Sequence, residues 1–231
     1  MITLNSDAAS TSLSKTTKAI LNEYGIKLNK NLGQNYLIDR NKRDQIIQFG
    51  NLTKDDVVLE IGPGIGTLTI ELAKRVKKVI AIEQDSNICQ ILENRLKKEN
   101  IDNVELINDD ALNVEFPKFD KIISNLPYQI SSPITFKFLN YDFQLAILMY
   151  QKEFASRMNG KVGSKDYSRL SAMLYFKCDV DLLTGISAES FIPKPKVDST
   201  VVRLTPKLPE LNGQLKHLNI NEINEKDFNT Y

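Results

Sequence analysis

From Val57 onward, the sequence alternates short β-branched runs with segments of helical periodicity. Strands are predicted at 57–62, 78–83, 104–109, 121–126 and 143–150, and helices at 67–75, 86–98 and 132–139. The strand runs are apolar throughout, and helix-length connections separate them. This pattern favours a parallel sheet that is covered by helices on both faces and joined by right-handed crossovers. In such a sheet, ligands bind beyond the carboxyl ends of the strands.

The composition limits the classes of protein to which the chain can belong. The chain has 231 residues, of which 42% are hydrophobic, enough for one substantial core. The formal net charge is +1, so any nucleic-acid binding has to depend on local clusters of charge. Cys89 and Cys178 form no CxxC pair, which argues against a metal site and favours a reducing compartment, the cytoplasm. No apolar run reaches membrane-spanning length, so we expect no targeting segment and no membrane contact.

Three regions are expected along the chain. Residues 1–14 are rich in Ser, Thr, Asn and Asp and are predicted to be disordered, with order beginning near Lys15. Residues 15–206 form the main domain, which ends in a last strand at 199–205. The polar tail 207–231 is expected to begin as a linker.

A glycine turn follows the first predicted strand. Gly62, Gly64 and Gly66 allow a tight turn and a close approach of backbone to ligand, and the next helix offers free N–H groups. The strict dinucleotide fingerprint needs glycine where Thr67 stands, which weakens a pyrophosphate interpretation. Glycines also close ordinary strand–helix turns, so the turn alone does not establish a nucleotide site.

Two acidic residues end the following strands. Glu83 lies about twenty residues beyond the glycine turn, where a carboxylate conventionally accepts hydrogen bonds from ribose hydroxyls. Asp110 closes the third strand and is placed to reach an adenine amino group, although a helix cap or turn would also explain it. Together these residues predict an adenosyl ligand.

The run Asn125-Leu126-Pro127-Tyr128 ends the fourth predicted strand. A Pro-containing turn would account for it, but several other motifs accompany it in order. With them it resembles the family of ribosomal RNA adenine dimethyltransferases, which use S-adenosylmethionine. The matching segments are NLGQNYL at 31–37 (the family has NLGQNFL), EIGPG at 60–64, NLPY at 125–128, QKE at 151–153, GSK at 163–165 and FIPKPKV at 191–197.

The resemblance implies a Rossmann-like class I methyltransferase fold, with a mostly parallel sheet and an antiparallel C-terminal strand. It implies transfer of two methyl groups to each of two adjacent adenosines near the 3′ end of small-subunit rRNA, within a small-subunit or pre-ribosomal particle, by a monomer. The family also carries a C-terminal helical domain, so 207–231 is expected to include the start of a truncated one. By matching positions, the residues expected to contact S-adenosylmethionine are Asn35, Leu37, Gly62, Gly64, Glu83, Asp110 and Asn125.

The NLPY residues suit transfer to an amino group. Hydrogen bonds from the adenine amine to the Asn125 side-chain oxygen and the Leu126 carbonyl would aim the nitrogen lone pair at the methyl group, with no general base. Pro127 would hold that carbonyl in place. Tyr128 and Phe191 are predicted to form the walls for an unstacked base, although Phe191 also fits as a core aromatic. No metal is expected.

Two basic clusters are candidates for contact with RNA phosphates. One lies between Lys15 and Asp44 and includes Lys42 and Arg43; the other lies between 152 and 169 and includes Lys161 and Lys165. Solvated helix faces also collect Lys and Arg, so either cluster can be merely structural.

Three other functions remain open from the residues. A nicotinamide dehydrogenase would share the glycine turn and Glu83 but would leave NLPY unexplained. A non-catalytic RNA-binding assembly factor could keep the same fold. Methyltransferases that act on DNA adenine or protein glutamine use a related motif with two prolines, where this chain has Leu126 before Pro127.

Overall fold

The structure is a computed structural model that describes residues 12–26 and 35–207. Its helices are α1 (Leu13–Glu23), α2 (Arg40–Phe49), α3 (Thr69–Ala73), α4 (Ser86–Lys98), α5 (Ser131–Phe138), α6 (Lys152–Met158) and α7 (Arg169–Lys177). Its strands are β1 (Tyr36–Leu37), β2 (Val57–Ile61), β3 (Lys78–Glu83), β4 (Val104–Asn108), β5 (Lys121–Asn125), β6 (Leu145–Gln151), β7 (Cys178–Ile186), β8 (Phe191–Ile192) and β9 (Ser199–Pro206).

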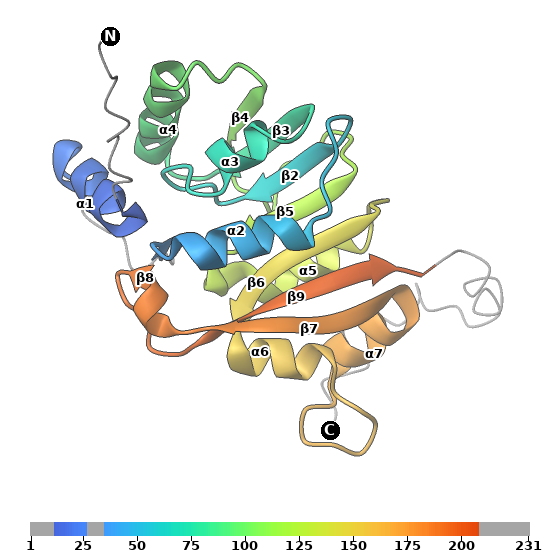
Figure 1. The fold of residues 1–231 in the computed structure, drawn as a ribbon. Coiled ribbons are helices and arrows are strands. Elements are labelled where there is room, and N and C mark those ends of the chain that lie inside the picture. Colours follow the sequence, from blue (N-terminus) through green and yellow to red (C-terminus); the bar gives the residue numbers. More distant parts are fainter. Residues whose placement is uncertain (1–11, 27–34, 208–231) are drawn as a thin grey trace, which may run out of the picture.

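A seven-stranded sheet forms the centre of the molecule, in the order β4-β3-β2-β5-β6-β9-β7 (Figure 1). Strands β2 to β6 pair in parallel, and β9 runs antiparallel to both of its neighbours. The predicted fold class, with an antiparallel C-terminal strand, is therefore confirmed.

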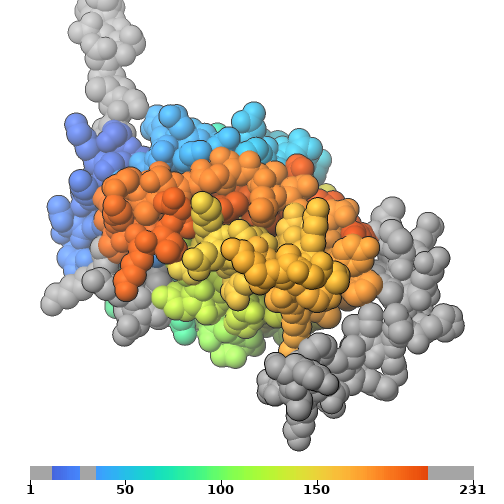
Figure 2. Space-filling model, turned by 90° about the horizontal axis from the view of Figure 1, so that it is seen from below, coloured from blue at the N-terminus to red at the C-terminus, as the bar shows by residue number. Residues whose placement is uncertain are grey.

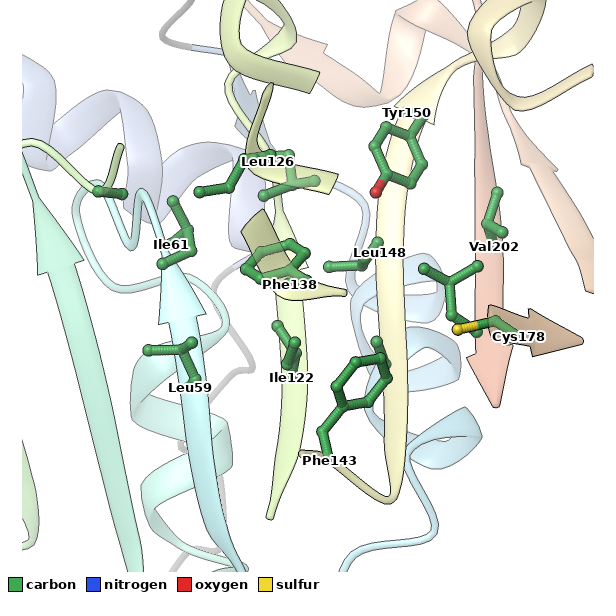
Figure 3. Packing of buried hydrophobic residues seen from close by; sticks show 14 of the residues in the cluster. Leu59, Ile61, Ile122, Leu126, Phe138, Phe143, Leu148, Tyr150, Cys178 and Val202 are labelled. Atoms are coloured by element: carbon green, nitrogen blue, oxygen red, sulfur yellow. The ribbon is translucent and has the colours of Figure 1, made fainter. Parts of the chain in front are cut away.

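The central strands are buried on both faces because their apolar residues alternate between two cores. Leu59 and Ile122 belong to the core that α5, α6 and α7 cover, whereas Val58 and Ile123 belong to the core under α2 and α3. Figure 3 shows the first of these cores, in which Phe138 of α5 packs among side chains from β2, β5 and β6. Burial of both faces explains why the strand sequences read as continuous apolar runs.

A second, two-stranded sheet joins distant parts of the chain. β1 and β8 pair antiparallel, with Tyr36 opposite Ile192 and Leu37 opposite Phe191. Neither strand was predicted, and α2 was not predicted either, because two residues carry no periodicity and the first turns of α2 are strongly polar.

The structure corrects the expected start of order. α1 begins at Leu13, because Ser12 caps it and its side chain accepts a hydrogen bond from the Lys15 N–H. The remainder of the expected disordered segment, the motif residues 31–34 and the tail beyond 207 lie outside the described residues. Within the described part of the chain, no helix is long and apolar enough to span a membrane, and no cluster of acidic, His and Cys side chains could hold a metal ion.

Candidate active site

The glycine turn after β2 is a tight backbone loop. Gly62, Gly64 and Gly66 all have positive φ, at 66°, 55° and 87°. A Cβ on Gly64 would lie 2.7 Å from Tyr36 Cε1, so any larger side chain there would collide with β1. Both the backbone conformation and the close approach of Tyr36 therefore require glycine at position 64.

The end of β3 is tied to this turn by Glu83. Its Oε2 accepts from the Gly64 N–H at 3.1 Å, and its Oε1 accepts from the Asp85 N–H at 3.0 Å. Burial raises the pKa of Glu83 above its usual range, which these backbone donors partly offset. The carboxylate is thus held in one orientation at the strand edge.

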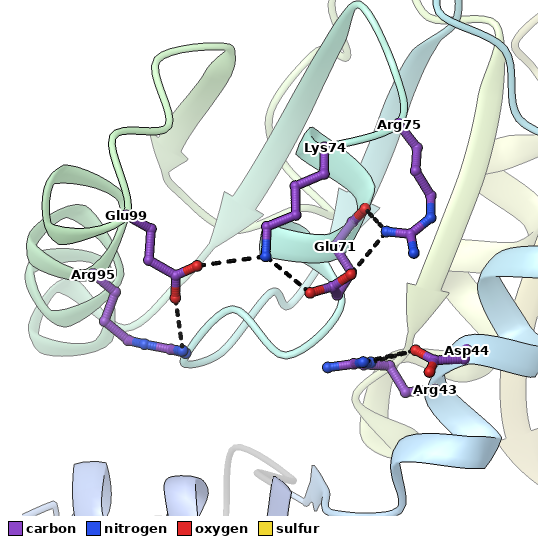
Figure 4. A network of polar contacts seen from close by, with 7 residues as sticks. All are labelled: Arg43, Asp44, Glu71, Lys74, Arg75, Arg95 and Glu99. Carbon is purple, nitrogen blue, oxygen red and sulfur yellow. Dashed lines mark hydrogen bonds and ion pairs between the residues drawn. The ribbon is translucent and has the colours of Figure 1, made fainter. Parts of the chain in front are cut away.

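A polar network supports the outer side of the glycine turn (Figure 4). Arg95 of α4 donates to the Ile65 carbonyl and pairs with Glu99. Glu99 also lies 3.6 Å from Lys74 Nζ, which in turn pairs with Glu71 of α3 at 3.0 Å. These contacts join α3, α4 and the turn, so they restrict movement of the turn relative to both helices.

The NLPY residues continue β5 into a 3₁₀ turn at Tyr128–Ile130. The Asn125 amide nitrogen donates to the Asn35 carbonyl at 3.0 Å, which orients the Asn125 side chain. Leu126 is buried, and Pro127 has φ −60° and ψ 122°, the extended conformation expected before a turn. The Tyr128 hydroxyl lies 2.6 Å from the Ser199 hydroxyl, so the ring is held at its far end.

These groups line one pocket at the carboxyl edge of the sheet. It brings together all the predicted cofactor residues and all four NLPY residues, namely Asn35, Leu37, Gly62, Gly64, Glu83, Asp110, Asn125, Leu126, Pro127 and Tyr128. These positions are spread over more than ninety residues of sequence. Their convergence follows from the parallel topology, since β2, β3, β4 and β5 end at the same edge.

Asp110 lies at the pocket and also acts as the turn residue considered from sequence. It lines the pocket, and its Oδ1 accepts from the Leu112 N–H at 2.9 Å while its Oδ2 accepts from the Asn113 side chain at 3.1 Å. The carboxylate therefore stabilises the loop after β4. The same loop holds the carboxylate at the pocket.

Phe191 does not join the other predicted site residues. It is 2% exposed and packs in the core under α2 and α3, and it is not among the residues that line the pocket. The alternative considered for it, a core aromatic, describes its position. Its pairing with Leu37 across the small sheet directs it inward.

The predicted RNA-binding residues occupy different environments. Arg43 is 9% exposed and its guanidinium contacts Asp44 at 2.7 Å, so the structure does not place it on open surface. Lys42 is half-buried and donates to Thr184 at 3.3 Å. Lys161 and Lys165 are exposed on the loop between α6 and α7, and Figure 2 shows the face of the molecule on which the chain around residues 150–175 lies. The helix α2, which carries Lys42 and Arg43, covers one face of the sheet, and α6 and α7 cover the other.

Two buried polar groups of the pocket were not predicted. Glu60 is 2% exposed and Tyr36 is 6% exposed, and among the described residues the Glu60 Oε2 and the Tyr36 Oη have no hydrogen-bond partner. Burial raises the pKa of Glu60 to about 8. A carboxylate within the apolar run VVLEI is the signal that could have indicated Glu60.

The pocket chemistry fits an adenosyl ligand with a positively charged sulfur. Four acidic residues line it, Glu60, Glu83, Asp109 and Asp110, and no Lys or Arg is among the described residues of the lining. A pyrophosphate would be repelled by the ionised carboxylates among these residues, whereas a cation would be attracted. Apolar side chains, including Ile82 and Ile130, supply walls for an aromatic base.

Comparisons with known proteins agree with this site. The model of the family described as ribosomal RNA adenine dimethylase matches residues 25–229. A probable ribosomal RNA small subunit methyltransferase A from Methanosphaera stadtmanae is 54% identical over 83% of this chain and 70% of its own length. A protein with the same description from Methanothermobacter thermautotrophicus is 53% identical over 82% of this chain and 68% of its own length.

Solved structures show the same fold. A dimethyladenosine transferase from Plasmodium falciparum has a TM-score of 0.73 and 40% identity, over 80% of this chain and 66% of its own. The 23S rRNA methyltransferase ErmE has a TM-score of 0.68 and 30% identity, over 82% of this chain and 80% of its own. The sheet of this protein is thus that of a Rossmann-like class I methyltransferase. On the matches in sequence and structure together, the chain belongs to the ribosomal RNA adenine dimethylase family.

Proposed function

We propose that this protein transfers methyl groups from S-adenosylmethionine to the amino groups of two adjacent adenines near the 3′ end of small-subunit rRNA. The observation that carries the proposal is the single pocket in which the glycine turn and Glu83 meet Asn125 and Tyr128. Relatives described as small subunit methyltransferases match at 54% and 53% identity, against 30% for ErmE, which favours the small-subunit rRNA.

The cofactor is expected to lie across the ends of β2, β3 and β4. Gly62 and Gly64 allow a close backbone approach, Glu83 presents its carboxylate to ribose hydroxyls, and Asp110 lies toward the adenine. When bound, S-adenosylmethionine supplies an electrophilic methyl group on a positively charged sulfur. The acidic lining would stabilise that charge. The product, whose sulfur is uncharged, would be held less tightly.

Asn125 and Leu126 act on the target amine. Because the Asn125 amide nitrogen already donates to Asn35, its oxygen is the end that remains to accept from the adenine amino group. The Leu126 carbonyl, held by Pro127, is the second acceptor. Positive charge grows on the nitrogen as it is methylated, so two fixed carbonyl dipoles stabilise the transition state more than the ground state.

Tyr128 provides the stacking face for the target base. An adenine in a helix cannot reach the pocket, so it has to leave the stack before reaction. The bond between the hydroxyls of Tyr128 and Ser199 fixes the ring without using its face. A rigid ring lowers the entropy lost when the base stacks on it.

Contact with RNA phosphates is assigned to the exposed lysines. Lys161 and Lys165 extend from the α6–α7 loop, which projects from the body of the protein in Figure 1. They favour binding to a folded RNA or small-subunit particle with marked salt dependence. We propose that the protein acts as a monomer in the cytoplasm.

The test is mass analysis of small-subunit and large-subunit rRNA after ribosomal particles are incubated with the protein and labelled S-adenosylmethionine. We expect N6,N6-dimethyladenosine in small-subunit rRNA, formed at least about a hundredfold more slowly with Asn125→Ala at equal protein concentration. Label confined to large-subunit rRNA would contradict the substrate. Binding of the particle without methylation would instead support the alternative, a non-catalytic assembly factor.

A further inference from the structure

The turn after β4 carries Asp110 to the pocket. β4 is an edge strand of the seven-stranded sheet, and the chain at 110–114 belongs to neither a helix nor a strand. The Asp110 carbonyl accepts from the N–H groups of Asn113 and Val114 at 2.9 and 3.0 Å, which closes the turn on itself. Asp110 and Ala111 line the pocket. The placement of these two residues therefore depends on contacts between the turn and the rest of the molecule.

Lys137 of α5 binds the backbone of this turn. Its Nζ donates to the carbonyls of Ala111 at 2.9 Å, of Leu112 at 3.2 Å and of Val114. An ammonium group has three protons, so three carbonyls around one nitrogen match it. The side chain is half-buried, and its Nζ lies 4.4 Å from the centroid of the Phe116 ring. Hydrogen bonds from a charged donor are stronger than neutral ones, so this one side chain fixes the turn.

The helix that carries Lys137 continues directly from the NLPY segment. The 3₁₀ turn Tyr128–Ile130 is followed at once by α5, which begins at Ser131. Tyr128 and Ile130 line the same pocket as Asp110 and Ala111. Lys137 thus joins two walls of the pocket, the turn expected at the cofactor adenine and the segment expected at the target base.

We propose that Lys137 is a positioning residue, which holds the turn so that the Asp110 carboxylate accepts from the 6-amino group of the adenosyl ligand. The Leu112 N–H donates to Asp110 Oδ1 at 2.9 Å, and the Leu112 carbonyl is one of those that Lys137 binds. The ammonium and the carboxylate are therefore connected through one residue. Lys137 is not among the described residues that line the pocket, so it acts through Asp110 rather than on the ligand. The inference rests on the proposed function, because it takes the adenosyl ligand as the occupant.

The test compares Lys137→Met with a matched variant, Lys207→Met. Lys207 Nζ also donates to a backbone carbonyl, that of Tyr175 at 2.7 Å, and lies 4.8 Å from the centroid of the Tyr175 ring, outside the described pocket lining. Methionine keeps an apolar stem and removes the ammonium in both variants. In calorimetry, Lys137→Met should weaken binding of S-adenosylhomocysteine by about 5–10-fold, and Lys207→Met should leave it within about twofold of the parent.

An analogue of S-adenosylhomocysteine in which hydrogen replaces the 6-amino group separates positioning from general stability. The loss caused by Lys137→Met should shrink to within about twofold for this analogue, because Asp110 then has no amino group to meet. A merely structural role of Lys137 would weaken both ligands alike. Equal losses for the two ligands would therefore overturn the inference, and so would unchanged affinity of Lys137→Met for S-adenosylhomocysteine when the parent binds it normally.

Lys137→Arg takes the place of Lys137→Met if the latter does not fold. Its planar guanidinium keeps the charge but cannot direct three donors from one nitrogen. We expect a loss of about 2–5-fold for S-adenosylhomocysteine and none for the analogue, and either no loss or equal losses would overturn the inference. A parent protein that binds no S-adenosylhomocysteine contradicts the proposed function itself.

Discussion

Buried polar groups differ in their hydrogen-bond pairing between the two ends of strands β2 and β5. At the amino ends, Lys121 Nζ lies 2.9 Å from Asp56 Oδ2, with both side chains 8% exposed. Lys121 also donates to the Asn51 carbonyl at 2.7 Å, and Asp56 accepts from the Thr53 N–H at 2.6 Å. At the carboxyl ends, by contrast, the described residues supply no hydrogen-bond partner to the Tyr36 hydroxyl or to one Glu60 oxygen.

Because of this difference, the paired groups that stabilise the fold and the groups that line the pocket lie at opposite ends of one sheet. Fully paired buried groups rigidify a fold, and breaking one such group leaves an uncompensated charge. Unpaired buried groups lower the stability of the protein, because they have given up their hydrogen bonds to water. Changes at the amino ends should therefore alter unfolding without altering the pocket, whereas changes at the carboxyl ends should alter the pocket as well as unfolding.

The largest effect on stability is expected at the amino ends. Lys121→Met leaves Asp56 buried without its ion pair and should lower the free energy of unfolding by about 3–5 kcal/mol, measured by urea denaturation. The double variant Lys121→Met, Asp56→Leu should recover most of that loss. S-adenosylhomocysteine affinity should stay within about twofold of the parent, and a larger loss in the folded variant would show that the two ends are not independent.

The largest effect on chemistry is expected at Asn125. Asn125→Ala removes an oriented acceptor for the target amine and should slow single-turnover methyl transfer by about a hundredfold or more, equivalent to about 3 kcal/mol. Ser124→Ala is the matched control, because Ser124 bonds to the buried Ile61 carbonyl at 2.6 Å and does not line the pocket. It should lose stability and keep its rate; equal rates for the parent and Asn125→Ala would exclude the role assigned to Asn125.

Glu60 should make stability depend on pH. Its folded-state pKa is raised to about 8, so it favours the folded protein fully below the unfolded pKa and loses that contribution as pH rises toward 8. Between pH 5 and pH 8 the parent should lose about 3–4 kcal/mol relative to Glu60→Gln, because each unit of pKa is worth about 1.4 kcal/mol. Urea titrations at several pH values measure this difference, and parallel curves for the two proteins would contradict it.

The smallest effect is expected for Tyr128→Phe. Stacking on the ring face alone would make this variant silent, but the hydroxyl is bonded to Ser199 at 2.6 Å. Loss of that bond should cost about 1 kcal/mol of stability and reduce methyl transfer only about two- to threefold. Tyr128→Ala should weaken the free energy of productive RNA binding by roughly 1–3 kcal/mol more, because the base loses the ring on which it stacks. A Phe variant as impaired as the Ala variant would assign the hydroxyl, rather than the ring, to function.

The parallel sheet and most of the pocket were predictable because their signals are local. Apolar runs with helix-length connections indicate a parallel sheet, and the strand ends of such a sheet bring Glu83, Asp110 and Asn125 to one edge. The glycine turn was predictable for the same reason, since a positive φ is required by the turn itself.

What the sequence by itself determined is therefore which residue types end which strands, because periodicity and turn chemistry involve near neighbours. The tertiary structure decided which of those groups find partners. It buries Phe191 and Arg43, orients Asn125 through Asn35 ninety residues away, and supplies no partner for the Tyr36 hydroxyl among the described residues. These outcomes depend on which distant side chains exclude water from each group, and that is a property of packing between elements rather than of any segment alone.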